Sequence, residues 1–157
     1  MSNGATTSPL FPADNPAVTA HLATLQGIIT RLANNSASCK TWCLTLVGAL
    51  VSLAGATHVP GIITFTLVPI TIFGFLDTMY LAQEKAYRTL YNSIVAKIQG
   101  QSYKLTDVFE AKTKLKGKYI GQALKSWAIW PVYLGLIATY LIAYFSGWLH
   151  LLTAPAK

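Results

Sequence analysis

The stretch VPGIITFTLVPITIFGFLDTMYLAQEKAYRTLYNSI, residues 59–94, joins two kinds of helix-forming sequence. Its first eighteen residues, 59–76, carry no charge, and about 20 apolar residues are enough to cross the hydrocarbon core of a bilayer. From Asp77 onward the sequence is charged and rich in tyrosine, and neither Gly nor Pro interrupts it before Gly100. We therefore expect a helix that leaves a membrane near Asp77 and continues into water.

The distribution of charge extends this interpretation to the whole chain. Of the 157 residues, 53% are hydrophobic and 11% are charged, whereas an average soluble domain has roughly 25% charged residues. No Asp, Glu, Lys or Arg occurs between Lys40 and Asp77, or between Lys125 and Lys157. Uncharged stretches of this length predict an all-α integral membrane protein, because a helix satisfies its own backbone hydrogen bonds in lipid.

Charge and helical periodicity divide the chain into six segments. From the N-terminus we expect a flexible tail (1–15), a cytoplasmic amphipathic helix (16–40), a transmembrane helical hairpin (41–77), a cytoplasmic helix with a lysine-rich segment (78–125), a third transmembrane helix (126–150) and a short C-terminal tail (151–157). The hairpin has spans over 41–57 and about 60–77, joined by the turn HVPG at 58–61. The predicted fold is an amphipathic helix and three transmembrane helices, of which the second extends into the cytoplasm.

The orientation in the membrane follows from the positive charges. Seven lysines and two acidic residues lie from position 97 to position 125, which gives this segment +5 of the chain's formal net charge of +7. Positive residues are concentrated in the cytoplasmic loops of membrane proteins. We therefore expect the N-terminus and residues 78–125 to be cytoplasmic and the C-terminus to lie on the other side.

The sequence contains no motif of a known type of enzyme. Neither the H-E-x-x-H nor the G-x-S-x-G pattern occurs, and the glycine-rich nucleotide-binding patterns are also missing. Cys39 and Cys43 are four positions apart, which places them on one helix face, and small packing residues are their simplest interpretation. We expect no enzymatic activity, no catalytic residue, no cofactor and no metal ion.

Basic and aromatic residues are interleaved in the cytoplasmic part of the second helix. The lysine-rich loop at 97–125 follows this helix, and its usual interpretation is attraction to anionic lipid headgroups. A nucleic-acid or nucleotide site is the alternative. The same mixture also suits a nucleic acid, because basic groups contact phosphates and aromatic rings stack on bases. For an oligonucleotide or nucleotide ligand, the candidate binding residues are Arg31, Lys40, Lys85, Tyr87, Arg88 and Tyr91.

Asp77 has two interpretations, because a carboxylate at the end of a span is costly unless it is paired or wet. One is an interfacial aspartate held by Lys40 or Arg31, the other is a residue of a cytoplasmic pore mouth, and the two do not exclude each other. Small, weakly polar residues in the spans could line a water pathway if several subunits assembled. Including the aspartate, the candidate pore residues are Ser52, Thr64, Thr71 and Asp77.

Three stretches resemble a known group of proteins, and these are LQGIITRLANNSASCKTWCLTLVGAL (25–50), FLDTMYLAQEKAYRTLYN (75–92) and SWAIWPVYLGL (126–136). They contain an Asn-Ser-rich helix entering the first span, an L-D-x-x-Y-L-x-x-E-[KR] helix leaving the second, and an S-x-x-I-W-P start to the third. This combination resembles the small transmembrane effectors of bacterial anti-phage defence operons, in particular those of the Hailong system, which accompany a nucleotidyltransferase.

The resemblance implies a homo-oligomeric, tetrameric ion channel in the bacterial inner membrane. A single-stranded DNA oligomer made by the partner nucleotidyltransferase would keep the channel closed. Loss of that ligand during infection would open the channel, depolarise the membrane and stop growth, an outcome called abortive infection. A function of a different class is also consistent with the residues: a non-conducting membrane anchor that recruits a cytoplasmic partner through residues 78–125.

Overall fold

The computed structural model describes residues 15–57, 59, 61–109 and 111–145. The helices are α1 (Pro16–Thr57), α2 (Gly61–Thr64), α3 (Leu67–Gln99), the short 3-10 helix η1 (Leu105–Phe109), α4 (Gly117–Leu124) and α5 (Trp130–Phe145). These residues contain no β-strand, which confirms the all-α prediction.

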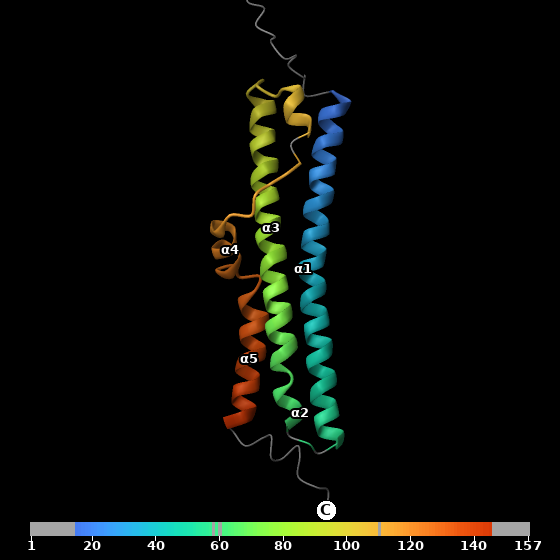
Figure 1. Ribbon diagram of the computed structural model, residues 1–157, viewed down its shortest axis with the longest axis vertical. Coiled ribbons are helices and arrows are strands. Elements are labelled where there is room, and N and C mark those ends of the chain that lie inside the picture. The colour runs from blue at the N-terminus through green and yellow to red at the C-terminus, as the bar shows by residue number, and fades with distance from the viewer. Residues whose placement is uncertain (1–14, 58, 60, 110, 146–157) are drawn as a thin grey trace, which may run out of the picture.

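Two long antiparallel helices, α1 and α3, form the frame of the molecule and lie side by side (Figure 1). At 1.5 Å per residue, the 42 residues of α1 extend over about 63 Å. The expected amphipathic helix (16–40) and first span (41–57) are therefore parts of one continuous helix. Its continuity has a local cause, because neither Gly nor Pro occurs between Gly27 and Gly48.

The expected second span, 60–77, contains a turn near its start. α2 ends at Thr64 and α3 begins at Leu67, with Pro69 in its first turn. Proline has no backbone N–H to donate to the carbonyl four residues earlier, and it fits best in the first turn of a helix. The hydroxyl of Thr66 donates a hydrogen bond of 2.7 Å to the Ile63 carbonyl, so this buried side chain is satisfied within the turn.

The remaining elements pack on α3 and cap the hairpin. α4 and α5 pack against α3, which lies between them and α1 in the view of Figure 1, and α5 lies beside the uncharged part of α3. η1 lies at the other end of the hairpin, near the start of α1 (Figure 1). α5 begins at Trp130 rather than at 126, and residues 146–150 of the expected third span lie outside the described residues.

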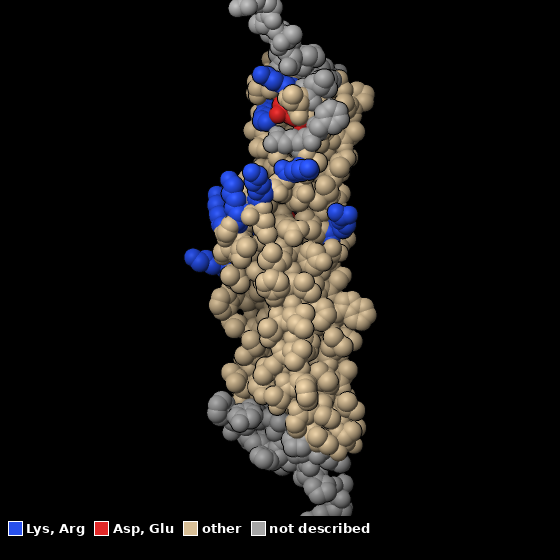
Figure 2. All heavy atoms as spheres, in the orientation of Figure 1, with Lys and Arg blue, Asp and Glu red and all other residues tan. Residues whose placement is uncertain are grey.

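Charge divides the described molecule into two halves. We call α1 up to Lys40, α3 from Asp77 and residues 100–125 the polar half, and we call residues 41–76 with α5 the apolar half. On the face shown in Figure 2, every Lys, Arg, Asp and Glu side chain lies over the polar half. Two stretches, α1 and Gly61–Gln99, are long and apolar enough to cross a membrane, and α5 has a shorter apolar segment.

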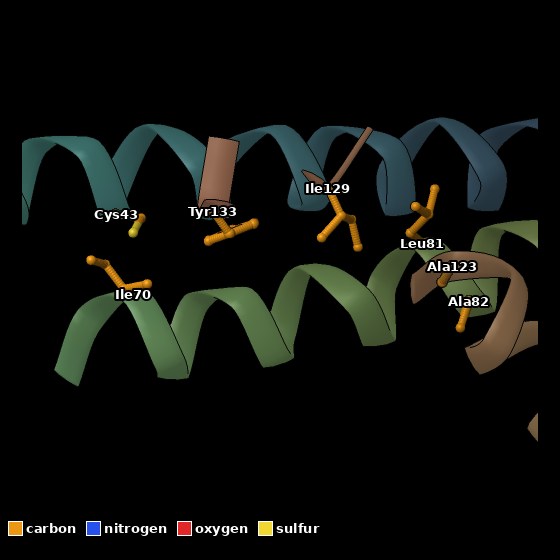
Figure 3. Close-up of a cluster of buried hydrophobic side chains, with 7 residues drawn as sticks. All are labelled: Cys43, Ile70, Leu81, Ala82, Ala123, Ile129 and Tyr133. Carbon is orange, nitrogen blue, oxygen red and sulfur yellow. The ribbon is translucent and has the colours of Figure 1, made fainter. Parts of the chain in front are cut away.

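Each half has its own cluster of buried side chains. In the apolar half and at its boundary, the cluster brings together α1, α3, α4 and the start of α5 (Figure 3). It consists of Cys43, Ile70, Leu81, Ala82, Ala123, Ile129 and Tyr133. The cluster at the far end of the polar half consists of Val18, Leu25, Ile94 and Tyr103. The two clusters hold α1 and α3 together along most of their length.

Candidate functional site

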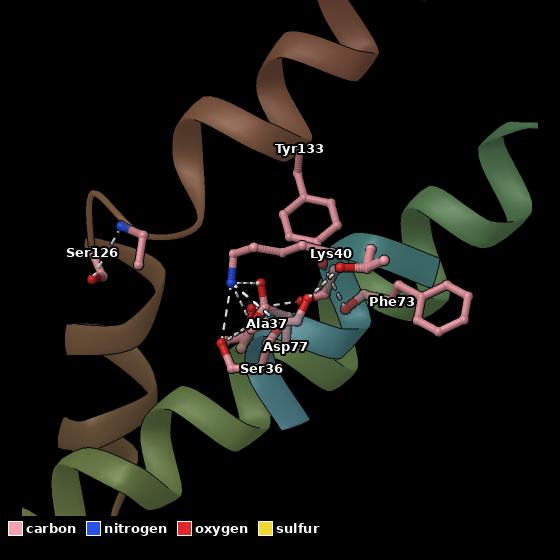
Figure 4. A network of polar contacts seen from close by, with 11 residues as sticks. Ser36, Ala37, Lys40, Phe73, Asp77, Ser126 and Tyr133 are labelled. Carbon is pink, nitrogen blue, oxygen red and sulfur yellow. Dashed lines mark hydrogen bonds and ion pairs between the residues drawn. The ribbon is translucent and has the colours of Figure 1, made fainter. Parts of the chain in front are cut away.

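A buried charge pair lies where the apolar half meets the polar half. The side chain of Asp77, on α3, is fully buried, and that of Lys40, on α1, is 20% exposed. Lys40 Nζ lies 2.9 Å from Asp77 Oδ1 and 2.7 Å from Oδ2. The Ser36 hydroxyl donates to Oδ1 and accepts a hydrogen bond of 3.1 Å from Lys40 Nζ (Figure 4). We call Ser36, Lys40 and Asp77 the boundary network.

The sequence explains why these groups meet. Ser36 and Lys40 are one helical turn apart, so both face α3 at the level where its uncharged stretch ends. A carboxylate removed from water is costly unless a counter-ion and hydrogen bonds compensate it. Of the two partners expected for Asp77, Lys40 forms the ion pair. Arg31 is exposed and forms no ion pair with a described residue. Within one chain, the Asp77 carboxylate is enclosed between α1 and α3.

A third helix approaches the boundary network through Tyr133 of α5. The ring of Tyr133 points toward Lys40 and Asp77 (Figure 4), and its hydroxyl donates a hydrogen bond of 3.2 Å to the Phe73 carbonyl. A Cβ atom at Gly74 would lie 3.4 Å from Tyr133 Cδ1, so the glycine allows the ring to lie closely against α3. Sequence reasoning missed Ser36 and Tyr133, and only Ser36 had a signal, namely its spacing from Lys40.

The polar half contains a hollow of about 400 Å³ between α1 and α3. We call it the polar groove, and it is lined by Gln26, Ile29, Thr30, Arg88, Tyr91 and Asn92. Gln26 Nε2 donates a hydrogen bond of 3.1 Å to the Tyr91 hydroxyl, which joins the two walls. Arg88 Nε donates to Glu84 Oε1 at 2.7 Å, and the Arg88 side chain is 59% exposed. The groove therefore offers one exposed guanidinium, one ring, and amide and hydroxyl groups.

The predicted ligand-binding residues do not form one surface. Arg88 and Tyr91 line the polar groove, and Tyr91 also packs against the cluster at the end of the hairpin. Tyr87 is half-buried against the same cluster and does not line the groove. Lys85 is half-buried, and Lys40 is held by Asp77. Sequence reasoning missed the polar residues that α1 and α3 add to the groove, which are Gln26, Thr30 and Asn92.

The end of the hairpin is closed by the segment that follows α3. Tyr103 is buried, and its hydroxyl lies 2.8 Å from Nδ1 of the buried His21. Burial raises the pKa of Tyr103. Lys97 Nζ lies 2.7 Å from Asp107 Oδ1. Burial alone would raise the pKa of Asp107, but hydrogen bonds from Lys97 and from the Lys104 backbone, with the charges of both lysines, hold it below its usual value.

Comparison with known proteins does not add a family to these observations. No protein-family model, curated protein or solved structure matches the chain. Among the described residues, no group of three or more His, Cys, Asp and Glu side chains is placed to hold a metal ion. Cys39 and Cys43 are buried free thiols.

The predicted pore residues also lie apart from one another. Thr71 is exposed and lies in the hollow that α3 forms with α4 and α5, and its hydroxyl donates to the Leu67 carbonyl at 2.8 Å. Thr64 is exposed at the end of α2. Ser52 is exposed on α1, and Asp77 is buried in the boundary network. A common pathway through these four residues is therefore not formed within one chain.

Ser52 belongs to a longer row of small and polar residues on α1. We call this row the outer stripe, and it consists of Asn34, Ser38, Thr41, Thr45, Gly48, Ser52 and Gly55. The steps alternate between four and three residues, which keeps the row on one helix face. A buried residue on the α3 side of α1 stands two positions before each of four members of the row, namely Asn34, Ser38, Thr41 and Thr45. Two positions turn a helix by about 200°, so the outer stripe faces away from α3.

Proposed function

We propose that this protein is an oligomeric ion channel of a bacterial inner membrane, whose opening is controlled by an anionic ligand on its cytoplasmic side. The outer stripe is the observation that carries this proposal. It places hydroxyl groups and glycines along the free face of a helix whose neighbouring faces are strongly apolar. Such a face suits close packing against another helix or contact with water inside a bilayer, and within one chain it is left exposed.

The exposed apolar surface supports a location in the membrane. Only 17% of the most apolar 18-residue window of α1 is buried, whereas the core helix of a soluble protein is mostly buried. Large apolar side chains are exposed along the same half of the molecule, among them Leu44, Leu53, Phe65, Phe75 and Ile142. We propose three spans, formed by α1, α3 and α5, with the N-terminus in the cytoplasm because the positive charges lie at that end.

Self-association follows from the outer stripe. Small residues let helices approach closely in lipid, and hydroxyl groups add hydrogen bonds between them. The Thr41 and Thr45 hydroxyls donate to carbonyls one turn earlier, at 3.3 and 2.9 Å, so they tolerate lipid and still present acceptor oxygens. In a tetramer, the number that the resemblance implies, four outer stripes facing one axis would line a weakly polar pathway.

The polar groove supports control by an anionic ligand. Its Arg88 and Tyr91 suit a phosphate and a base, and its amide groups suit a base edge. The ligand that the resemblance implies is a single-stranded DNA oligomer made by a partner nucleotidyltransferase. Its loss during phage infection would open the channel, depolarise the membrane and end in abortive infection.

The test is to measure current across a planar bilayer that contains the purified full-length protein. We expect discrete currents, and we expect short single-stranded oligonucleotides on the cytoplasmic side to suppress them. Thr45→Leu should reduce the current strongly, because it places a bulky apolar group in the outer stripe. Its matched control is Thr139→Leu on α5, another exposed threonine whose hydroxyl donates to a carbonyl one turn earlier, at 2.8 Å.

Two results would contradict the channel. Equal currents for Thr45→Leu and Thr139→Leu would remove the outer stripe from the pathway. A silent bilayer with correctly inserted wild-type protein would favour the non-conducting anchor, and capture of a cytoplasmic partner through residues 78–125 would then be the next measurement.

A further inference from the structure

We propose that residues 112–130, which we call the boundary segment, bind anionic lipid headgroups of the cytoplasmic leaflet. The inference rests on the proposal that the apolar half lies in a bilayer, but it does not depend on conduction or on the ligand. It is carried by charge, by position along α3 and by exposed apolar side chains at the same level.

The charge of the boundary segment has one sign. It contains five lysines and no acidic residue, and all five side chains are exposed. These are Lys112, Lys114, Lys116, Lys118 and Lys125. None of them forms an ion pair with a described residue, whereas Lys40, Arg88 and Lys97 each have a carboxylate partner. The segment therefore offers a row of ammonium groups to a partner outside the chain.

The position of the segment is fixed by α4. Ala123 is fully buried in the cluster that also contains Leu81 and Ala82 of α3 (Figure 3). Ala82 follows Asp77 by five residues, which is about 7.5 Å along the helix. α4 therefore lies just beyond the point where the uncharged stretch of α3 ends, and Figure 2 shows lysines and arginines at this level with uncharged surface below.

Exposed apolar side chains follow the lysines at this level. The Trp127 side chain is 85% exposed, and Leu124 and Trp130 are about half exposed. The indole nitrogen of Trp130 donates to the Leu124 carbonyl, so the polar atom of that ring is satisfied at the end of α4. Tryptophan is enriched at membrane interfaces because its ring is largely apolar and carries one donor.

This combination fits a lipid better than a nucleic acid. A single strand is bound by basic groups together with aromatic rings on which bases stack. Here the exposed apolar side chains beside the lysines include the aliphatic Leu115 and Leu124 as well as Trp127 and Trp130, and aliphatic side chains offer no stacking surface for a base. An anionic lipid has both the phosphate for the lysines and the acyl chain for the leucines and tryptophans.

The test uses the full-length protein with Trp127 as its only tryptophan, the other three being replaced by Phe. It is reconstituted in phosphatidylcholine vesicles that contain equal fractions of brominated phosphatidylglycerol or brominated phosphatidylcholine, and fluorescence quenching is compared. Quenching by either lipid reports insertion near Trp127. A stronger effect of the anionic lipid reports the proposed preference, so the two proposals are tested separately.

We expect a preference for the anionic lipid of about fivefold or more, because each lysine near the surface contributes roughly that factor. The preference should fall toward onefold in 1 M salt, since screening is then almost complete. Lys114→Gln with Lys116→Gln and Lys118→Gln should lower the preference severalfold, with Lys112 and Lys125 left in place. Lys104→Gln is the control, because Lys104 is an exposed lysine at the far end of the polar half and should leave the preference unchanged.

Three outcomes would overturn the inference. The first is equal quenching by the two brominated lipids in an inserted protein. The second is an equal loss of preference in the triple variant and in Lys104→Gln, which would indicate net charge rather than a surface. The third is a preserved lipid preference in the triple variant together with lost oligonucleotide binding, which would assign these lysines to a nucleic acid.

Discussion

Replacing Lys40 with Met should destabilise the protein more than replacing Asp77 with Asn. The Asp77 side chain is fully buried, so removal of Lys40 leaves a carboxylate with no counter-ion. Breaking a buried ion pair in this way costs about 3–5 kcal/mol. Asp77→Asn leaves an acceptor oxygen for Ser36 and an ammonium group that is already 20% exposed on a flexible stem, so we expect about 1–3 kcal/mol.

The double variant Lys40→Met with Asp77→Leu separates the ion pair from the shape of the site. Replacing both partners of a buried pair with apolar residues is often neutral, so we expect a stability within about 1 kcal/mol of the wild type. The assay is thermal unfolding of the protein in a mild detergent, followed by near-ultraviolet circular dichroism. A change of 1 kcal/mol shifts the Tm of a chain of this size by about 2–4 °C, so Lys40→Met should lower it by about 6–20 °C.

Lys104→Met is the matched control, because the same substitution at an exposed lysine should leave the Tm within about 2 °C. Three results would refute the reasoning. One is a Lys40→Met protein that melts with the wild type. Another is a larger loss for Asp77→Asn than for Lys40→Met. The last is a double variant whose loss of stability equals the sum of the losses of the Lys40→Met and Asp77→Leu single variants, since the two sites would then be independent.

Three further predictions concern individual contacts. Tyr133→Phe removes the hydroxyl that donates to Phe73 and should lower the stability in detergent by about 0.5–1.5 kcal/mol; no change in Tm would place that hydroxyl outside the packing. The ion pair of Asp107 should stabilise the protein above the pKa of an unfolded aspartate, about 3.9, and be lost as the pH falls through its lower folded value. As the pH is lowered below about 4, the Tm of the wild type should therefore fall more steeply than the Tm of Asp107→Asn. Lys85→Glu with Arg88→Glu should weaken binding of a labelled single-stranded oligonucleotide and flatten its salt dependence in fluorescence anisotropy; unchanged binding would reject both as contacts.

Several features of the fold could be predicted because their cause is local. The uncharged stretch up to Asp77 predicts a helix that continues without a break into the charged stretch, and α3 does so. The pairing with Lys40 follows from the same argument, since a buried carboxylate needs a counter-ion and Lys40 borders the facing span. The sequence around residue 40 also contains no helix-breaking residue, which favours one continuous helix. The change of polarity at the same place led to the prediction of two helices instead.

Other features depend on how helices meet, which the spacing of residues does not determine. Tyr133 reaches Phe73 only because α5 packs on the side of α3 that carries Gly74. The polar groove depends on the rotation of α1 against α3, so basic residues were predicted for it while Gln26 and Asn92 were missed. Tyr87 is an aromatic residue of the kind that contacts a ligand, but it packs against the cluster at the end of the hairpin. Aromatic rings serve both purposes, and sequence alone does not separate them.

The course of α1 gives a final prediction about coupling. Thr30 in the polar groove, Lys40 in the boundary network and Thr45 in the outer stripe lie on one unbroken helix. From Thr30 to Thr45 the distance is about 22 Å, and a helix without Gly or Pro there moves almost as a rigid body. A ligand in the groove would touch both α1 and α3. We propose that it shifts one helix relative to the other and that the Lys40–Asp77 ion pair transmits this shift to the apolar half. We expect Lys40→Met channels to conduct but to lose suppression by oligonucleotide, while oligonucleotide binding measured by fluorescence anisotropy stays close to that of the wild type. Suppression that survives in this variant would show that the ligand acts on the outer stripe by a route that does not use the Lys40–Asp77 pair.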